Sequence, residues 1–252
     1  MYLVTIIPTL DRVDFLRKSI NSILKQTRKP DKVIIINNNQ KNDINREIFN
    51  KFKNDLNLEY FDDFDSITKI RNTAAFKTNG DLIAFLDDDD QWHRDYISKS
   101  IDLFKKKNLD ALYTSYDLVD LNEKKLSEIN LKDDYNIDEV LVYNPGFLTS
   151  NVIIKKKVFE KLKGFNSKFG SADKDLFIRL KEQGYKFYIN PERLVFRTEH
   201  LNQLSKDYKL IFYDKIKFFY NNFRKLNFKN KAIYMKSSLA IFYKFLRKLL
   251  NK

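Results

Sequence analysis

Four consecutive aspartates, Asp87 to Asp90, directly follow a short apolar run at residues 82–86. The apolar run has the length and composition of a buried strand. Adjacent carboxylates at a strand end repel one another, and core packing does not offset that repulsion. A bound divalent cation does offset it, because Mg²⁺ and Mn²⁺ take carboxylate oxygens as ligands. The pattern therefore favours a metal site, and a solvated acidic loop is the alternative.

The elements that must position these aspartates follow from the hydrophobic periodicity of the first half. Short β-branched and apolar runs alternate with amphipathic helix patterns, and only a few residues link them. This alternation is typical of a parallel, doubly wound sheet. We expect strands at residues 3–7, 33–36, 58–61 and 82–86, and helices at residues 13–26, 43–56, 67–80 and 95–107.

Polar residues stand where the expected strands end. Pro8 and Thr9 end the first strand, and three asparagines at 37–39 end the second. In a parallel sheet, ligands bind beyond the carboxyl ends of the strands. These residues and the aspartates are therefore expected to converge on one site.

The second half of the chain has a less regular pattern. The residues at 130–145 are polar and are expected to form a loop, and a helix is expected to begin at Asp173 and to end at Gly184. The strands expected here lie at residues 111–119, 147–154, 186–189 and 194–197.

Length and composition bound the class of protein. The chain has 252 residues, enough for one sizeable α/β core with an appendage. It contains no cysteine, which excludes disulfides and cysteine-based metal sites or nucleophiles. The first residues are expected to form a strand and not a signal peptide, because no basic leader precedes them. No apolar stretch approaches the length of a membrane span.

The positive charge of the chain is concentrated in its tail, residues 206–252. Lys and Arg outnumber Asp and Glu by 47 to 34, a formal net charge of +13. Thirteen of the basic residues and two of the acidic ones lie in the tail, which therefore carries +11. On a helix, the apolar residues Leu239, Phe242, Leu246, Leu249 and Leu250 would share one face, flanked by Lys244, Arg247, Lys248 and Asn251.

Residues 3–205 resemble a family 2 glycosyltransferase with the GT-A fold. The resemblance rests on several short motifs that follow one another in the order and spacing of that family. The matching residues are Ile7-Pro8-Thr9-Leu10-Asp11-Arg12, Val33-Ile34-Ile35-Ile36-Asn37-Asn38, Arg71-Asn72, Gly80-Asp81, Phe85-Leu86-Asp87-Asp88-Asp89-Asp90, Gly164-Phe165-Asn166, Ser171-Ala172-Asp173-Lys174-Asp175-Leu176, His200 and Ser205.

The resemblance implies a Rossmann-like α/β/α sandwich with a mixed, mostly parallel sheet and a C-terminal helical extension. Residues 1–205 would form the catalytic domain, with a nucleotide-binding half at about 1–109 and an acceptor half at about 110–205. Residues 206–252 would form a basic amphipathic helical tail.

The aspartates fall on the Asp-X-Asp motif of the family. By this resemblance Asp89 is a ligand of Mn²⁺ or Mg²⁺, and Asp87 and Asp88 hold ribose or donor hydroxyls. The metal would bridge both phosphates and neutralise the leaving diphosphate. His200 stands where the family often has a metal ligand or phosphate contact, and a structural histidine is the alternative.

The resemblance also implies a pocket for the nucleotide. Pro8, Thr9 and Asp11 would line the base and the ribose. Asn38 stands where the family commonly has an aspartate that accepts the uracil N3 proton, and an asparagine carbonyl can also accept it. Arg71 would contact the nucleotide or would satisfy loop carbonyls instead.

Asp173 falls on the second acid of the family's Glu-Asp motif, the general base for the acceptor hydroxyl. Ala172 replaces the usual glutamate, a departure that affects acceptor contacts. The alternative for Asp173 is a helix N-cap. Trp92 and His93 are candidates for the acceptor side, and core packing is the alternative for Trp92.

The leading hypothesis is an inverting glycosyltransferase. It would move a sugar from a nucleotide-diphosphate sugar, most simply a UDP-sugar, to a hydroxyl of a bacterial cell-surface glycan or lipid-linked oligosaccharide, as in lipopolysaccharide or capsule biosynthesis. The tail would hold this cytoplasmic enzyme peripherally on the anionic inner face of the cytoplasmic membrane. A tail helix that packs on the catalytic domain is the alternative.

Two rival functions make different demands on the sequence. A nucleic-acid-binding protein would use the basic tail, but no nucleic-acid motif accompanies the charge, and such a protein has no need of the aspartates. A sugar nucleotidyltransferase usually has a glycine-rich, basic phosphate loop after its first strand, and residues 8–12 do not form one.

Overall fold

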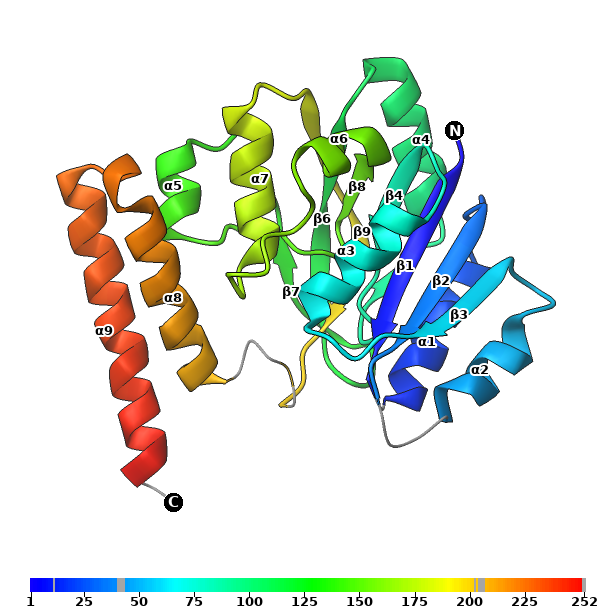
Figure 1. Cartoon of the computed structure of the whole chain (residues 1–252), viewed down its shortest axis with the longest axis horizontal. Coiled ribbons are helices and arrows are strands. Elements are labelled where there is room, and N and C mark those ends of the chain that lie inside the picture. Colours follow the sequence, from blue (N-terminus) through cyan, green and yellow to red (C-terminus); the bar gives the residue numbers. More distant parts are fainter. Residues whose placement is uncertain (11, 40–43, 202, 204–206, 251–252) are drawn as a thin grey trace.

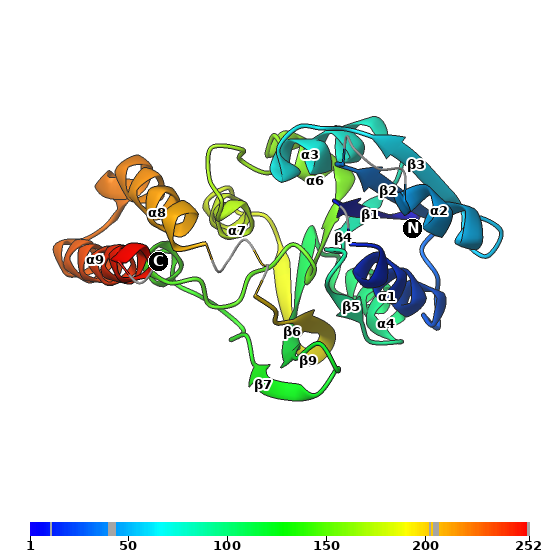
Figure 2. The same ribbon diagram turned by 90° about the horizontal axis from the view of Figure 1, so that it is seen from below.

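The computed structural model describes residues 1–10, 12–39, 44–201, 203 and 207–250. A mixed, curled β-sheet separates two layers of helices, and a pair of helices at the C-terminus extends one of the layers (Figure 1, Figure 2). This is the α/β/α sandwich with a helical extension that the sequence predicts.

The first half of the chain forms a parallel sheet in the order β3-β2-β1-β4. β1, β2 and β4 are short and almost entirely buried, as befits strands of a sheet covered on both faces, whereas the edge strand β3 has no buried residue. The elements are β1 (Leu3–Thr9), α1 (Val13–Leu24), β2 (Lys32–Asn37), α2 (Ile44–Phe52), β3 (Leu58–Asp62), α3 (Ile67–Lys77) and β4 (Leu82–Phe85).

The second half continues the sheet in the order β8-β6-β9-β5, and β7 pairs with the free part of β6. β8 runs antiparallel to both β4 and β6, so β6 and β9 run in the same direction as the strands of the first half. The elements are β5 (Gln91–Trp92), α4 (Tyr96–Lys107), β6 (Ala111–Val119), β7 (Lys125–Ile129), α5 (Ile137–Val142), β8 (Val152–Lys155), α6 (Lys156–Lys161), α7 (Ala172–Glu182) and β9 (Phe187–Thr198).

Alternate side chains of each strand enter one of two cores. In β1, Val4 and Ile6 face a core that α3, α6 and α7 cover. Leu3 and Ile7 face the opposite core, under α1 and α4. This arrangement leaves the carboxyl ends of β1, β2 and β4 together at one edge of the sheet, where β1 reaches the lower edge in Figure 1.

The tail forms a helical hairpin of α8 (Tyr208–Asn222) and α9 (Phe228–Leu250), joined through a 3₁₀ turn at Phe223–Lys225. α8 lies between α7 and α9 in both views (Figure 1, Figure 2). Phe218 and Tyr234 of the hairpin are buried in the same core as α7. The tail therefore packs on the rest of the protein, which is the alternative that the sequence left open.

The hairpin interface changes which face of α9 is exposed. Phe242 packs on Phe212 of α8 with ring centroids 4.9 Å apart, so it does not lie on an outward face as expected. Leu239 and Leu246 are exposed. The side chains of Leu249 and Leu250 lie outside the described part of the chain. No helix in the described ranges combines the length and the apolar composition needed to cross a bilayer.

Three expectations for the second half were wrong. The region 130–145 contains α5, because Oδ1 of Asn136 accepts the backbone N–H of Asp138 and caps a helix. The strand expected at 147–154 is confined to β8, because the segment before it is folded around the Asn151 side chain. The two short strands near the end are one strand, β9, whose pairing with β6 is irregular where Pro191 interrupts the ladder.

Candidate active site

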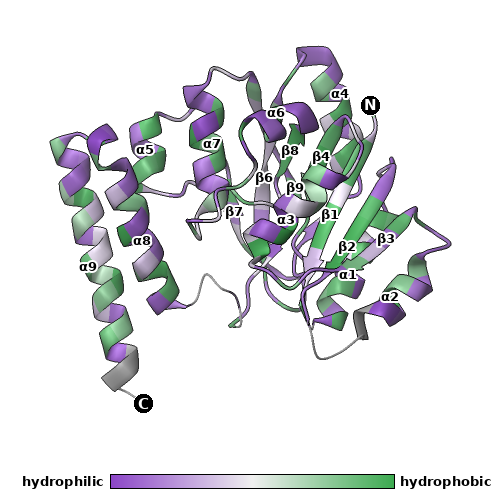
Figure 3. Cartoon of the chain, in the orientation of Figure 1, coloured by the Kyte–Doolittle hydropathy of each residue, from purple (hydrophilic) through white to green (hydrophobic). Residues whose placement is uncertain are grey.

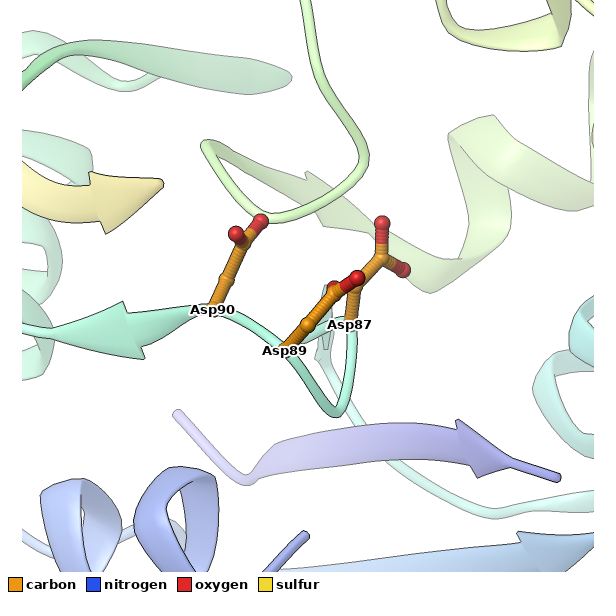
Figure 4. A group of neighbouring side chains, drawn as sticks. All are labelled: Asp87, Asp89 and Asp90. Carbon is orange, nitrogen blue, oxygen red and sulfur yellow. The ribbon is translucent and has the colours of Figure 1, made fainter. Parts of the chain in front are cut away.

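The turn between β4 and β5 gathers three carboxylates at the carboxyl edge of the sheet. One ligand oxygen from each of Asp87, Asp89 and Asp90 lies within 4.8 Å of the other two. The three side chains leave the turn on the same side (Figure 4). Carboxylate oxygens at this spacing suit Mg²⁺ or Mn²⁺. The donor set fits the metal that the sequence predicts, with Asp87 and Asp90 as additional candidate ligands.

Two arginines neutralise part of this acidic cluster. Arg71 of α3 forms an ion pair with Asp87. Arg12, just before α1, pairs with Asp88 and also places Nη1 2.9 Å from Oδ2 of Asp89. Because opposite charges offset the repulsion between neighbouring carboxylates, these arginines help to hold the turn together.

His200 meets the cluster from the end of β9. Its Nε2 lies 2.9 Å from Oδ2 of Asp89, although the two residues are 111 positions apart in the chain. The imidazole is nearly buried and stacks on Phe15 of α1, with ring centroids 4.8 Å apart. The two residues predicted to hold the metal therefore lie in direct contact.

Asp88 points away from the other three aspartates and into the protein. Oγ1 of Thr9 donates to its Oδ2 at 2.7 Å, and Arg12 pairs with both of its oxygens. Burial raises the pKa of Asp88 to about 6, although the charge of Arg12 lowers it. In this structure Asp88 holds Arg12 in place, and its predicted contact with ribose or donor hydroxyls stays a prediction.

The segment before β8 forms the wall opposite the turn. Oγ1 of Thr149 donates to Oδ2 of Asp87 at 2.9 Å, and Oγ of Ser150 accepts the backbone N–H of Asp87 at 3.1 Å. Ser150 also bonds to Asp90, whose other contact is the backbone N–H of Thr198 at 3.2 Å. Burial, together with the charges of Asp89 and Asp87, raises the pKa of Asp90 well above its ordinary value.

Asp173 is the second residue of α7 and is not its cap. Ser171 occupies the N-cap position, and Oδ1 of Asp173 accepts the backbone N–H of Lys174 at 2.7 Å. Burial raises the pKa of Asp173 to about 6; Lys174 and Arg71 lower it, and Asp87 raises it. Arg71 and Asp87, which pair with each other, are therefore among the charged groups that act on Asp173.

Asp175, two residues further along α7, has a structural role. Nε of Arg179 donates to its Oδ2 at 2.6 Å, and the same guanidinium donates to backbone carbonyls at Leu162 and Gly164. This network ties the first turns of α7 to the turn at residues 162–164.

The residues predicted to line the nucleotide pocket lie side by side at the strand ends. Pro8 and Thr9 end β1, and the backbone N–H of Asn38, just past β2, donates to the carbonyl of Thr9 at 2.8 Å. Nδ2 of Asn38 donates to the carbonyl of Asp65. Asp11, also predicted for this pocket, lies outside the described residues. The nucleotide contacts of these residues remain predictions.

Trp92 is buried, so its assignment to the acceptor side is corrected. Only 2% of its surface is exposed, it stacks on Tyr96, and Nε1 donates to the carbonyl of Ser150 at 2.8 Å. It acts in the core and fixes a residue that bonds to Asp87. His93 lies in a shallow cleft with Asp117 and Glu192, away from the acidic cluster, and its acceptor role remains a prediction.

Four residues of the site were not predicted from the sequence: Arg12, Thr149, Ser150 and Arg197. Arg12 belongs to the motif Ile7-Pro8-Thr9-Leu10-Asp11-Arg12 and could have been found as a cation close to the end of the first strand. Arg197 interacts electrostatically with Tyr116, Asp90 and Asp173. No sequence signal marks it or the two hydroxyl residues, because their places depend on how β8 and β9 fold back.

Comparison with known proteins decides the family. The family model described as "Glycosyl transferase family 2" matches residues 4–163, more than half of the chain. The chain belongs to glycosyl transferase family 2. This confirms the family that the motifs suggest, and with it a transferase enzyme.

Two curated relatives have names that state either substrates or a biosynthetic process. One is the UDP-Glc:alpha-D-GlcNAc-diphosphoundecaprenol beta-1,3-glucosyltransferase WfgD of Escherichia coli, 27% identical over 122 residues, which are 48% of this chain and 48% of the relative. The other is the amylovoran biosynthesis glycosyltransferase AmsB of Erwinia amylovora, 26% identical over 162 residues, covering 58% of this chain and 54% of the relative. The chain thus spans about half the length of each of these relatives.

Two solved structures have the same fold. The S. aureus TarS structure with UDP-GlcNAc has a TM-score of 0.66 and 17% identity, and covers 98% of this chain and 72% of that one. The mannosyltransferase PcManGT of Pyrobaculum calidifontis with GDP-Man and Mn²⁺ has a TM-score of 0.65 and 16% identity, with 97% and 72% covered. The predicted GT-A fold is confirmed.

Proposed function

We propose that this glycosyl transferase family 2 chain moves a sugar, with inversion, from a UDP-sugar to a hydroxyl of a bacterial cell-surface glycan or lipid-linked oligosaccharide. The observation that carries this proposal is the trio Asp87, Asp89 and Asp90 at the strand ends, with Asp173 electrostatically coupled to it. A cation site and a candidate base on one edge of a sheet suit group transfer from a diphosphate.

Each part of the site has a task in this reaction. Asp87, Asp89 and Asp90 would hold Mn²⁺ or Mg²⁺, with His200 against Asp89. A bound divalent cation supplies Lewis-acid neutralisation of the leaving diphosphate. Asp173 would accept the proton of the acceptor hydroxyl as its oxygen attacks the anomeric carbon. Arg71, paired with Asp87, would place positive charge beside the donor.

Support for a UDP-sugar donor comes from the strand ends and from similar proteins. Asn38 lies next to Thr9, where its side chain carbonyl can accept a base N–H. The name of WfgD contains UDP-Glc, and the TarS structure holds UDP-GlcNAc. PcManGT holds GDP-Man, so GDP-sugars belong in the test as well.

Support for a lipid-linked acceptor at a membrane comes from α9. Its exposed apolar side chains recur at helical spacing along the side that faces away from α8, and basic residues flank them. Leu239 is 65% and Tyr243 68% exposed. Figure 3 shows hydrophobic residues along the length of this outer helix. The full stripe is Phe228, Met235, Leu239, Tyr243 and Leu246, with Lys229, Lys236, Lys244 and Arg247 exposed beside it.

We assign this α9 stripe to the anionic inner face of the cytoplasmic membrane. Each Lys or Arg near such a surface contributes about 1 kcal/mol, and the apolar residues add burial. A diphosphate-linked lipid acceptor, of the kind named for WfgD, would present its sugar at that surface.

The donor and the metal are tested together on the full chain. Thermal unfolding is measured against a panel of nucleotide diphosphates and nucleotide sugars, each with and without Mn²⁺. We expect UDP compounds to raise Tm only with Mn²⁺, and we expect chelation or Asp89→Ala to abolish both the shift and sugar transfer. Asp102→Asn on the exposed side of α4 is the matched control and should behave like the wild type. Full transfer in excess chelator would contradict the metal assignment.

A further inference from the structure

The N-terminus of α7 is capped by a residue from the tail. Ser171 stands at the N-cap position but makes no side-chain cap of its own. Asp214 of α8 takes that place: its carboxylate accepts the backbone N–H of Ser171 at 3.0 Å and also bonds to the backbone N–H of Gly170 and the hydroxyl of Ser171. A carboxylate at this end of a helix is favoured by both the free N–H groups and the helix dipole.

A second residue of α8 contacts the same stretch of chain, both before and after the dipeptide Ala172-Asp173. Phe218, one turn beyond Asp214, packs on Phe169 with ring centroids 5.1 Å apart. The Lys174 ammonium lies 3.9 Å from the centroid of the Phe218 ring. α8 therefore contacts the chain before and after the dipeptide Ala172-Asp173, so the backbone that carries Asp173 is fixed from both ends.

Gly170 leaves room for the carboxylate of Asp214 because it has no side chain. A Cβ atom built on Gly170 would lie 3.2 Å from Cγ of Asp214, closer than most side chains tolerate. The absence of a side chain there lets the carboxylate approach both N–H groups. The contact between the tail and the start of α7 is therefore close and specific.

We propose that Asp214 is a positioning residue that holds Ser171 and thereby sets the place of Asp173 relative to the acceptor hydroxyl. This rests on the proposed role of Asp173 as the general base. Reacting groups need near-attack geometry, and a misplacement of about 1 Å can cost about 10²-fold in rate. A residue in the tail, 43 positions from Ser171, thus contributes to catalysis without touching substrate.

The test compares two aspartates of the same helix in the full chain. Asp214→Ala removes the cap of α7, whereas Asp207→Ala removes the cap that α8 makes with its own N–H groups at Lys209 and Leu210. Each loses a cap, so each should lose a similar amount of stability. Both variants are compared at equal folded fraction. We expect Asp214→Ala to lower kcat about 10-fold, with the donor Kd changed less than about twofold. We expect Asp207→Ala to leave kcat within about twofold of the wild type.

Milder variants keep the proposal testable if Asp214→Ala does not fold. Asp214→Asn retains one acceptor oxygen and should lose less kcat than the alanine variant, and Gly170→Ala should lower kcat by crowding the carboxylate. Equal kcat values for the Asp214 and Asp207 variants, or unchanged kcat in Gly170→Ala, would overturn the proposal.

A readout independent of transfer separates this proposal from the proposed function. Amide hydrogen exchange at Gly170 and Ser171 should accelerate in Asp214→Ala and not in Asp207→Ala. If the wild type transfers no sugar yet this exchange difference is found, the proposed function fails and the cap stands. If exchange is unchanged, the cap itself is refuted.

Discussion

Three aspartates at the site, Asp88, Asp90 and Asp173, have raised pKa values, and burial is the first cause for each. Their surroundings nevertheless differ. Asp88 is enclosed by Arg12 and Thr9, and Asp90 lies among other carboxylates. Asp173 is coupled to Arg71 and Asp87 across the site. A base with a pKa near the operating pH is the most effective proton acceptor, so Asp173 is suited to that task.

We expect Asp173→Asn to retain donor binding and to lose at least about 10²-fold in kcat, the scale of general-base catalysis. Only the unprotonated form accepts a proton, so the kcat of the wild type should fall as pH drops below about 6, the pKa of Asp173. The measurement uses saturating metal and donor, which keeps Asp88 from dominating the profile. Asp102→Asn, which removes a carboxylate from the exposed side of α4, should keep both the rate and the acid limb. An acid limb that persists in Asp173→Asn would assign the proton to another group.

At the scale of elements, the turn after β4 and the segment before β8 depend on each other. Trp92 donates to the carbonyl of Ser150, and Ser150 in turn accepts the N–H of Asp87. A buried tryptophan on β5 thus fixes the wall of the candidate metal site. This gives Trp92 a task in the core that needs no contact with the acceptor.

Trp92→Phe keeps an aromatic ring but leaves the Ser150 carbonyl without its donor. We expect the free energy of unfolding to fall by about 1–3 kcal/mol, measured with urea, because a buried acceptor loses its partner. The KM for the acceptor should stay within about twofold of the wild type. Tyr96→Phe is the control on the stacked neighbour: its buried hydroxyl has no hydrogen-bond partner within the described part of the chain, so its loss should not destabilise. A raised acceptor KM in Trp92→Phe alone would restore the acceptor role.

The elements of the first half were predictable, and those around Ser150 were not, for a physical reason. β1, β2 and β4 repeat apolar residues over a strand length, which a sequence pattern reveals. Residues 147–151 begin with two apolar residues but are held by the Asn151 side chain, which donates to the carbonyls of Thr114 and Gly146. Hydrogen bonds of this kind, from a side chain to the backbone, produce no periodic pattern in the sequence.

The candidate site was predictable only in part for a similar reason. The four aspartates stand together in the chain and their repulsion alone suggested a cation. The contact of His200 with Asp89 spans 111 positions, and only the family resemblance anticipated it. Asp214 had no signal at all, because a cap supplied from another helix depends on tertiary packing.

At the scale of the whole molecule, the tail has two sides with different tasks. One side of the hairpin is buried, with Phe218 and Tyr234 in the same core as α7. The other carries the α9 stripe, and α9 ends beyond the edge where β1 has its carboxyl end (Figure 1). A membrane bound to the α9 stripe would therefore lie against the outer side of the hairpin, with α8 between α9 and α7.

We expect the full chain to bind anionic liposomes, less at high salt, and not to bind neutral ones. Leu239→Ser combined with Tyr243→Ser should weaken this binding at least about tenfold, because two large apolar side chains no longer enter the interface. Leu126→Ser on β7 is the matched control, since this leucine is also half exposed but lies far from the hairpin in the fold. Co-sedimentation measures all three. Equal binding by the wild type and the double variant would refute the membrane assignment.

Lys174 lies in the seam between α7 and α8 with only 6% of its surface exposed. Burial lowers the pKa of Lys174 to about 8. At pH 8 about half of these amines are therefore uncharged and nucleophilic, yet a reagent reaches them only when α8 lifts off α7. The rate at which a lysine-selective label reacts with Lys174 therefore measures how often α8 separates from α7. The labelling rate of the Lys174 amine thus reports the separation of α8 from α7, the motion that would release Asp173.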